Sequence, residues 1–175
     1  MDAVLPRLCR QSGRWATVTG QLRTLHRGAG TGEDRGREPV KPMVLVNHVL
    51  QDAADYAEHQ RVDCKLVASE ESKAVSVLGD GGLLQRAFDN VLQNALDHTP
   101  PGKSVKLSLS TGNERIRLIV ADEGPGAPED LLQHLFEPFF RADKSRGGKG
   151  WGLGLAIARD IIQAHDGHIS ARNRD

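Results

Sequence analysis

The chain has 175 residues, 38% of them hydrophobic, a formal net charge of +0 and 19 glycines. This length suits one domain with appended segments, and the apolar content allows a sizeable core. The balanced charge argues against a general nucleic-acid-binding protein, which needs a basic excess, and no apolar run approaches the ~18–20 residues of a membrane span.

The amino-terminal segment differs in composition from the rest of the chain. Scattered apolar residues between Val4 and Leu25 permit an interrupted helix, and this end is locally basic. Residues 28–36 hold four glycines among Thr, Glu, Asp and Arg, which is typical of a linker. We therefore expect a helical segment at 1–27, a linker at 28–38 and the main domain at 39–175.

Hydrophobic periodicity predicts an alternation of helices and strands in the main domain. An amphipathic helix from Val44 ends near His59, and short strands at 62–68 and 74–78 flank an acidic turn. Asp80 is the expected N-cap of a second helix that runs to His98, before the Thr-Pro-Pro-Gly stop. Alternating apolar residues predict neighbouring strands around 105–109 and 116–120. A short helix at 128–135, a longer one at 155–164 and a strand at 168–171 complete the prediction.

A glycine-rich run, Gly150-Trp151-Gly152-Leu153-Gly154-Leu155, leads directly into the last helix. Glycines let the backbone approach a ligand closely, and a helix N-terminus offers unpaired N–H groups to an anion. A P-loop is excluded because Lys149 precedes Gly150 instead of Ser or Thr. A dinucleotide fingerprint is excluded because Leu155 stands in place of its third glycine. A loop without a ligand is the remaining alternative to a phosphate site.

The second helix carries polar residues four apart beside its apolar stripe: Arg86, Asn90, Asn94 and His98. Asparagine is a mediocre helix former, so two in register ask for an explanation. Their amide oxygens suit magnesium, which also binds phosphate oxygens. Hydrogen bonding within the protein is the equally weighted alternative.

Asp122 ends a predicted strand and is followed by Gly124 and Gly126. A carboxylate fixed there can accept a hydrogen bond from an exocyclic amine, while the glycines admit a flat ring against the backbone. An ordinary Asp/Gly turn is the alternative.

Taken together, these segments resemble the conserved boxes of sensor histidine kinases. In chain order they are similar to the N box (Asn90 to Pro100), the G1 box (Asp122 to Gly126), the F box (Phe136 to Asp143) and the G2 box (Gly148 to Leu155). The resemblance implies their α+β Bergerat ATP-binding fold over residues 39–175. That fold is a two-layer sandwich in which helices cover one face of a mixed sheet and a mobile lid covers the nucleotide.

The resemblance also implies a role for each matching residue. Asn94 would be the main magnesium ligand, with Asn90 beside it near the phosphates, and Asp122 would accept from the adenine amine. The base would also be bordered by His98, Gly124 and Gly126. The G2 box would bind the phosphates through Gly150, Gly152, Leu153, Gly154 and Leu155. Cations on or near the lid would neutralise charge on the transferred phosphoryl group: Arg141, Arg146 and Lys149.

Several features depart from the family pattern. Asp97 stands where many members carry a base that reaches phosphate, which implies lowered triphosphate affinity, and Trp151 replaces the usual small residue in the G2 box. The phosphoacceptor motif is missing, and His26 fits it poorly. The family continues after the strand near His168 with another strand, so we expect the sheet to lack its last strand. Residues 1–27 would be a remnant of the dimerising hairpin.

The favoured function is therefore that of a cytoplasmic kinase catalytic domain. It would bind Mg-ATP and donate the γ-phosphoryl group to a histidine on a separate dimerisation domain, in cis or in trans, for relay to a response regulator. Neither nucleic acid nor direct membrane contact is expected, and the isolated cysteines, Cys9 and Cys64, fit a reducing cytosol whether or not the parent protein is membrane-bound. The alternatives are a related ATPase or serine kinase, which would carry a glutamate at the place of Asn90, and a catalytically silent nucleotide-sensing or partner-docking module.

Overall fold

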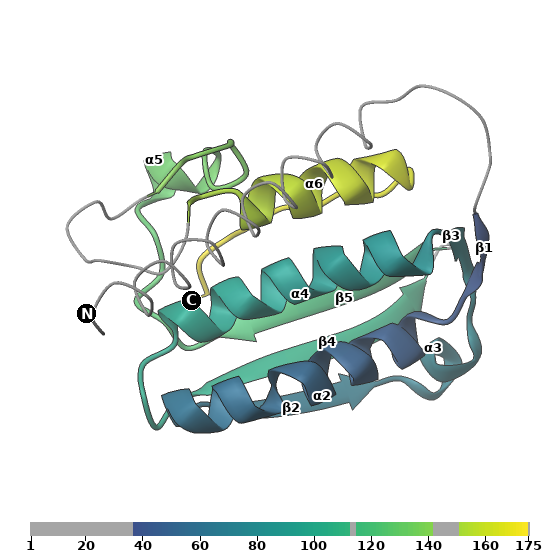
Figure 1. The fold of residues 1–175 in the computed structure, drawn as a ribbon, viewed down its shortest axis with the longest axis horizontal. Helices are drawn as coiled ribbons and strands as arrows, with labels where there is room; N and C mark the ends of the chain where they lie inside the picture. Colours follow the sequence, from purple (N-terminus) through teal and green to yellow (C-terminus); the bar gives the residue numbers. More distant parts are fainter. Residues whose placement is uncertain (1–36, 113–114, 142–150, 175) are drawn as a thin grey trace, which may run out of the picture.

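The computed structural model describes residues 37–112, 115–141 and 151–174 (Figure 1). Its central sheet has three strands in the order β2 (Asp63–Ala68), β4 (Ser104–Gly112) and β5 (Arg115–Asp122). β2 pairs with β4 in parallel, whereas β4 pairs with β5 antiparallel, and Leu107 lies in register with both Leu66 and Val120. The expected α+β class and mixed sheet are therefore confirmed.

Helices cover one face of this sheet. α2 (Pro42–Gln60) and α4 (Gly81–His98) lie side by side on it, and α6 (Gly154–Ala164) packs against α4 on the side away from α2 (Figure 1). Along β4, Val105, Leu107 and Leu109 are fully buried beneath the helices, while Lys106 between them is exposed. This alternation is what a sheet with one covered face requires. The helices predicted from Val44, after Asp80 and at 155–164 end within two residues of α2, α4 and α6, whereas the helix predicted at 128–135 is shorter, at Glu129–Leu132.

α4 is the central element because it packs in two directions. Leu92, Ala95 and Leu96 belong to the core cluster shared with α2 and the sheet. Ala87, earlier in the helix, belongs to a second cluster. This cluster contains Leu153 and three residues of α6: Ile157, Ala158 and Ile161. The helix begins as predicted, since Asp80 Oδ1 accepts a hydrogen bond from the Leu83 N–H at 3.0 Å.

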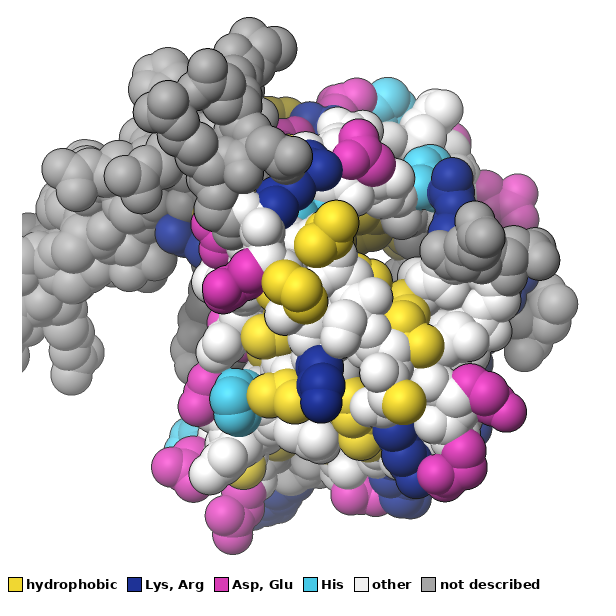
Figure 2. Space-filling view, turned by 90° about the vertical axis from the view of Figure 1, so that its right-hand side faces the viewer, with side chains coloured by type: hydrophobic (Ala, Val, Ile, Leu, Met, Phe, Trp, Pro, Cys, Tyr) yellow, Lys and Arg dark blue, Asp and Glu magenta, His cyan; other side chains and the backbone are white. Residues whose placement is uncertain are grey.

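A small two-stranded sheet lies beyond the carboxyl end of β2. It pairs β1 (Glu38–Val40) antiparallel with β3 (Val77–Gly79), and α3 (Glu70–Ala74) precedes β3. The strand predicted at 74–78 is thus shifted, because Ser69 caps a helical turn by accepting from the Ser72 N–H, and β1 was not expected. Hydrophobic side chains gather on this end of the molecule (Figure 2), where Leu78 is 67% exposed.

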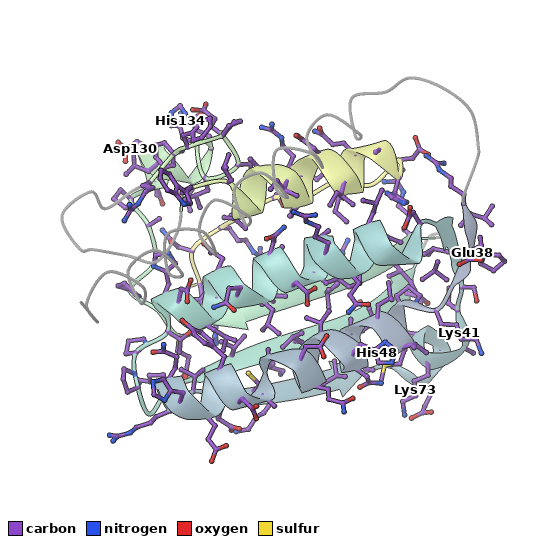
Figure 3. All side chains as sticks on the ribbon, viewed as in Figure 1. Glu38, Lys41, His48, Lys73, Asp130 and His134 are labelled. Atoms are coloured by element: carbon purple, nitrogen blue, oxygen red, sulfur yellow. The ribbon has the colours of Figure 1, made fainter. Side chains whose placement is uncertain are left out.

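Two side chains tie the carboxyl end of α6 to the rest of the domain. His165 Nε2 accepts from the Asp80 N–H at 3.0 Å, while its Nδ1 bonds the Ile161 carbonyl at 2.8 Å. Arg37 donates to the Ala164 carbonyl and pairs with Asp166. Both ring nitrogens of His165 are therefore hydrogen-bonded within the domain. Two further histidines, His48 on α2 and His134 just after α5 (Glu129–Leu132), lie at opposite ends of the molecule (Figure 3).

The strand predicted at 168–171 is wrong. Residues 168–174 follow α6 as an extended segment without ladder pairing. Ile169 packs against the α4–α6 cluster. The hydrogen bonds that join this segment to the turn after β5 come from the Asn173 side chain, which bonds the backbone of Ala127. A side-chain amide has replaced the backbone ladder here. In the described part of the chain, no helix is long and apolar enough to cross a membrane.

We expect Asp80→Ala to lower the free energy of unfolding by about 1 kcal/mol, the typical value of a lost N-cap bond. Chemical denaturation monitored by circular dichroism measures this change. Asp55→Ala is the matched control, since Asp55 is an exposed mid-helix residue of α2 where alanine has the higher helix propensity. Equal stabilities of the two variants would contradict the capping role.

Candidate functional site

The polar edge of α4 faces the start of α6. Asn90 is half-buried, and its Oδ1 lies 3.4 Å from the position that a Cβ on Gly154 would occupy. Its Nδ2 atom is buried and, among the described residues, has no hydrogen-bond partner. Buried amide donors are rarely left unpaired, because each costs about 1–3 kcal/mol of desolvation. Asn90 is therefore placed at the α6 N-terminus at an energetic cost.

The other end of the same edge meets the turn after β5. A Cβ on Gly124 would lie 2.7 Å from the carbonyl oxygen of His98 and 2.7 Å from Asp122 Oδ1. Only glycine permits this approach of the turn to the end of α4. Asn94 is half-buried one turn before His98, so the spacing of four places it between the two ends of the edge.

Asp122 is half-buried at the end of β5, as predicted. Its Oδ1 accepts from the Gly124 N–H at 2.8 Å, which fixes the carboxylate in the turn. Among the residues that the structure describes, none donates to Oδ2. The Asp/Gly turn that stood as an alternative is thus present, and it leaves the second oxygen available for a ligand.

The turn is tied to its surroundings at two further places. Glu123 Oε2 accepts from the Ser104 N–H at 2.8 Å and from its hydroxyl at 2.9 Å. These hydrogen bonds, the backbone one foremost, lower the pKa of Glu123. Beyond Gly126, which has a φ of 71°, Ala127 is bonded by the Asn173 side chain. Sequence reasoning missed Asn173, because no spacing pattern connects it to a turn 46 residues earlier.

The glycine turn before α6 packs on the aromatic segment that precedes it. Gly152 has a φ of 67°, and the Phe140 carbonyl and the Phe139 backbone occupy the space that its Cβ would need. The Phe139 N–H donates to the Gly152 carbonyl at 2.8 Å. The structure thus brings together the stretches matched to the F and G2 boxes.

The remaining G2 residues divide between core and surface. Leu153 is fully buried in the α4–α6 cluster, and Leu155 is half-buried. Gly154 opens α6, where helix N–H groups are unpaired. Arg141 is half-buried at the end of the described aromatic segment. Three predicted site residues lie outside the described residues: Arg146, Lys149 and Gly150.

The Asp97 side chain is hydrogen-bonded to α2 and within α4. Its Oδ1 accepts from the Tyr56 hydroxyl of α2 at 2.6 Å and from Gln93 Nε2 at 2.9 Å. Burial, followed by the bond to Asp97, raises the pKa of Tyr56. The acid expected to oppose a triphosphate thus joins α4 to α2.

The polar edge of α4 offers neutral amide oxygens, which are possible ligands of a magnesium ion. The described residues hold no cluster of three or more His, Cys, Asp or Glu able to bind a metal. The amide oxygen of Asn90 nevertheless faces the α6 N-terminus, and magnesium is commonly held by few protein oxygens together with water and phosphate. The donor set therefore fits a metal that arrives with a polyphosphate.

Comparison with known protein families decides the assignment of the fold. Residues 79–175 match the model of the histidine kinase-, DNA gyrase B- and HSP90-like ATPase family. The chain belongs to this family. The match covers α4, β4, β5 and α6, which carry the site described above, and the resemblance to sensor histidine kinases predicted from the sequence is confirmed.

Curated relatives are sensor kinases. The chain is 41% identical over 100 residues to the signal transduction histidine-protein kinase BaeS of Escherichia coli, an alignment that covers 56% of this chain and 21% of BaeS. It is 35% identical over 178 residues to the sensor histidine kinase TrcS of Mycobacterium tuberculosis, covering 98% of this chain and 34% of TrcS. The chain therefore spans about a third or less of these relatives.

Solved structures agree with this assignment. The nucleotide-free catalytic domain of histidine kinase ThkA superposes with a TM-score of 0.71 at 25% identity, over 79% of this chain and 88% of that one. Full-length ShkA in complex with AMPPNP superposes with a TM-score of 0.80 at 26% identity, over 94% of this chain and 34% of ShkA. The expected fold of a kinase catalytic domain is thus confirmed.

We expect the stability of the domain to depend on the ionisation of Glu123. Because its folded pKa lies below the ordinary value of 4.5, its contribution is complete above about pH 4.5 and is lost as the pH falls through the folded pKa. The variant Glu123→Gln should therefore lose less stability than the wild type between about pH 6 and pH 3 in urea denaturation. Glu58→Gln, on the exposed side of α2, is the control and should follow the wild type. An equal acid response of wild type and Glu123→Gln would refute the role of this carboxylate.

Proposed function

We propose that this chain binds Mg-ATP along the polar edge of α4 and is the catalytic domain of a sensor histidine kinase. The observation that supports this proposal is the arrangement of two backbone turns at the two ends of that edge. One turn carries Asp122 beside His98, and the other opens α6 beside Asn90. A ligand that lies along the edge would meet a hydrogen-bond acceptor at one end and unpaired helix N–H groups at the other, which suits a purine nucleotide.

In this proposal each end of the edge has its own task. Asp122 accepts a hydrogen bond from the adenine amine through Oδ2, and Gly124 and Gly126 leave room for the base. Backbone N–H groups at Gly150, Gly152 and Gly154 bind the phosphates. Arg141, Arg146 and Lys149 stabilise negative charge on the phosphoryl group as it leaves, since phosphoryl transfer depends on positioning and electrostatics.

The amide oxygens of Asn94 and Asn90 would hold the magnesium ion. The ion supplies charge neutralisation to the bound phosphates. The asparagines, as neutral ligands, fix its place without adding negative charge beside the polyphosphate. Their position on a rigid helix, packed on both sides, keeps these ligands in register.

The phosphoryl group would pass to a histidine on a separate dimerisation domain and then to a response regulator. Residues 1–27 would be a remnant of that dimerising segment, joined by a linker at 28–38 to the catalytic domain at 39–175. Phe139 and Trp151, with exposed fractions of 64% and 52%, offer apolar contacts beside the site. We place the domain in the cytoplasm, as part of a larger sensor.

A kinase is favoured over an ATP-hydrolysing enzyme by the residue at position 90. An amide cannot take the proton from an attacking water, whereas a carboxylate can. We therefore expect negligible steady-state ATP hydrolysis and no autophosphorylation by the chain alone. Labelled phosphate should be transferred when a matching histidine domain is added. Rapid hydrolysis would favour the ATPase, and tight ATP binding without transfer would favour a nucleotide-sensing module.

We expect Asp122→Ala to weaken ATP binding by about 10- to 150-fold in calorimetry, because a charge-assisted hydrogen bond is worth about 1.5–3 kcal/mol. Asp122→Asn can keep the acceptor for the Gly124 N–H while losing the charge, so it separates the turn from base recognition. Asp130→Ala is the control, on α5 away from the α4 edge (Figure 3). Unchanged affinity in Asp122→Asn would show that the carboxylate does not contact the base.

We expect Asn94→Ala to abolish the magnesium dependence of ATP binding while leaving residual metal-free affinity for the nucleotide. Titrations with and without excess EDTA measure this dependence. Asn47→Ala, an exposed asparagine on α2, is the matched control and should retain it. Full magnesium dependence in Asn94→Ala would rule out Asn94 as the main ligand.

A further inference from the structure

The extended segment after α6 reaches back to the turn that carries Asp122. There the Asn173 side chain bonds both backbone groups of one residue. Its Oδ1 accepts from the Ala127 N–H at 3.0 Å, and its Nδ2 donates to the Ala127 carbonyl at 2.7 Å. This two-point bond, which we call the Asn173 clasp, has the pattern of a strand pairing made by one side chain.

The turn is shaped to receive this side chain. A Cβ on Gly126 would lie 2.7 Å from Asn173 Oδ1, closer than real Cβ contacts allow. Gly126 also has a φ of 71°, which disfavours other residues. Two independent features of one glycine therefore permit the clasp: its conformation and its missing side chain.

The clasp completes the fixation of the turn. At its start, Asp122 Oδ1 holds the Gly124 N–H, and Glu123 bonds Ser104 on β4. At its end, only the Asn173 clasp holds Ala127 among the hydrogen bonds of the described residues. Without it, the Gly-Pro-Gly stretch would be tied on one side alone, and glycine adds conformational freedom there.

We propose that Asn173 is a positioning residue for purine recognition: by clasping Ala127 it holds the turn in the conformation that aims Asp122 at the base. This inference rests on the proposed binding of ATP. Selectivity for the base would then depend partly on the segment after α6, which is far in sequence from the polar edge of α4. The phosphate end, at Asn90 and Gly154, does not depend on it.

The experiment compares Asn173→Ala with the wild type in calorimetric titrations of ATP, ADP and GTP. GTP carries a carbonyl where ATP carries the amine, so the ATP-to-GTP ratio reports on the aim of Asp122, and the ATP-to-ADP ratio reports on the phosphate end. We expect ATP binding to weaken about 5- to 10-fold, the order of magnitude of one lost hydrogen bond. The ATP-to-GTP ratio should fall, and the ATP-to-ADP ratio should stay constant. Arg172→Ala, at the adjacent exposed residue, is the control.

Two further measurements separate positioning from general stabilisation. Hydrogen exchange at the Ala127 amide should accelerate in Asn173→Ala and not in Arg172→Ala. In an Asp122→Ala background, Asn173→Ala should have almost no further effect on ATP binding, because the two residues act through one contact. Asn173→Asp keeps the acceptor and loses the donor, so it should recover at most part of the affinity.

The outcomes are distinct. If the wild type binds ATP and Asn173→Ala binds it equally well, this inference is overturned while the proposed function stands. Additive effects of Asn173→Ala and Asp122→Ala, or equal losses for ATP and GTP, would show a structural role only and also overturn it. Failure of the wild type to bind any nucleotide would overturn both.

Discussion

The two-sided packing of α4 is the constraint on which the rest of this structure depends. Leu92 and Leu96 bury one face of the helix against α2 and the sheet, while Ala87 faces the cluster built on Ile157 and Ile161 of α6. A helix held on two sides can neither rotate nor slide without opening a core cluster, and interiors packed at crystal density resist such openings. The narrow edge between the faces is where Asn90 and Asn94 stand, and their placement follows from this packing.

The buried polar side chain on that edge lowers the stability of the domain, and the packing of the fold does not require it. Asn90 keeps a buried amide hydrogen without a partner among the described residues, where an apolar side chain would remove the penalty. Local conflict of this kind is concentrated at functional sites. Gly124 and Gly152 are a second example. The absence of a side chain at each of them lets two backbone segments approach, while glycine adds conformational freedom to the unfolded chain.

Periodicity and capping chemistry were sufficient to predict the elements that form the core. The α4 helix, its Asp80 cap and the alternating residues of β4 and β5 all follow local rules. The contacts of Asp97 could not be predicted, because a motif match gives no side-chain direction and the partner Tyr56 lies 41 residues earlier in the sequence. The strand predicted at 168–171 is wrong for a similar reason, because the long-range hydrogen bonds that hold this segment come from the Asn173 side chain and no local pattern reveals them.

The parallel pairing of β2 with β4 has a consequence for how the protein folds. Parallel neighbours cannot be joined by a tight hairpin, so the connection between them runs through α3, β3 and the whole of α4. Closing the sheet therefore requires that α4 be docked first or at the same moment, which makes assembly of the sheet slow relative to local helix formation. A ligand that binds along α4 contacts part of the connection between β2 and β4. Because it binds only the folded domain, its binding raises the free energy of unfolding of the entire domain.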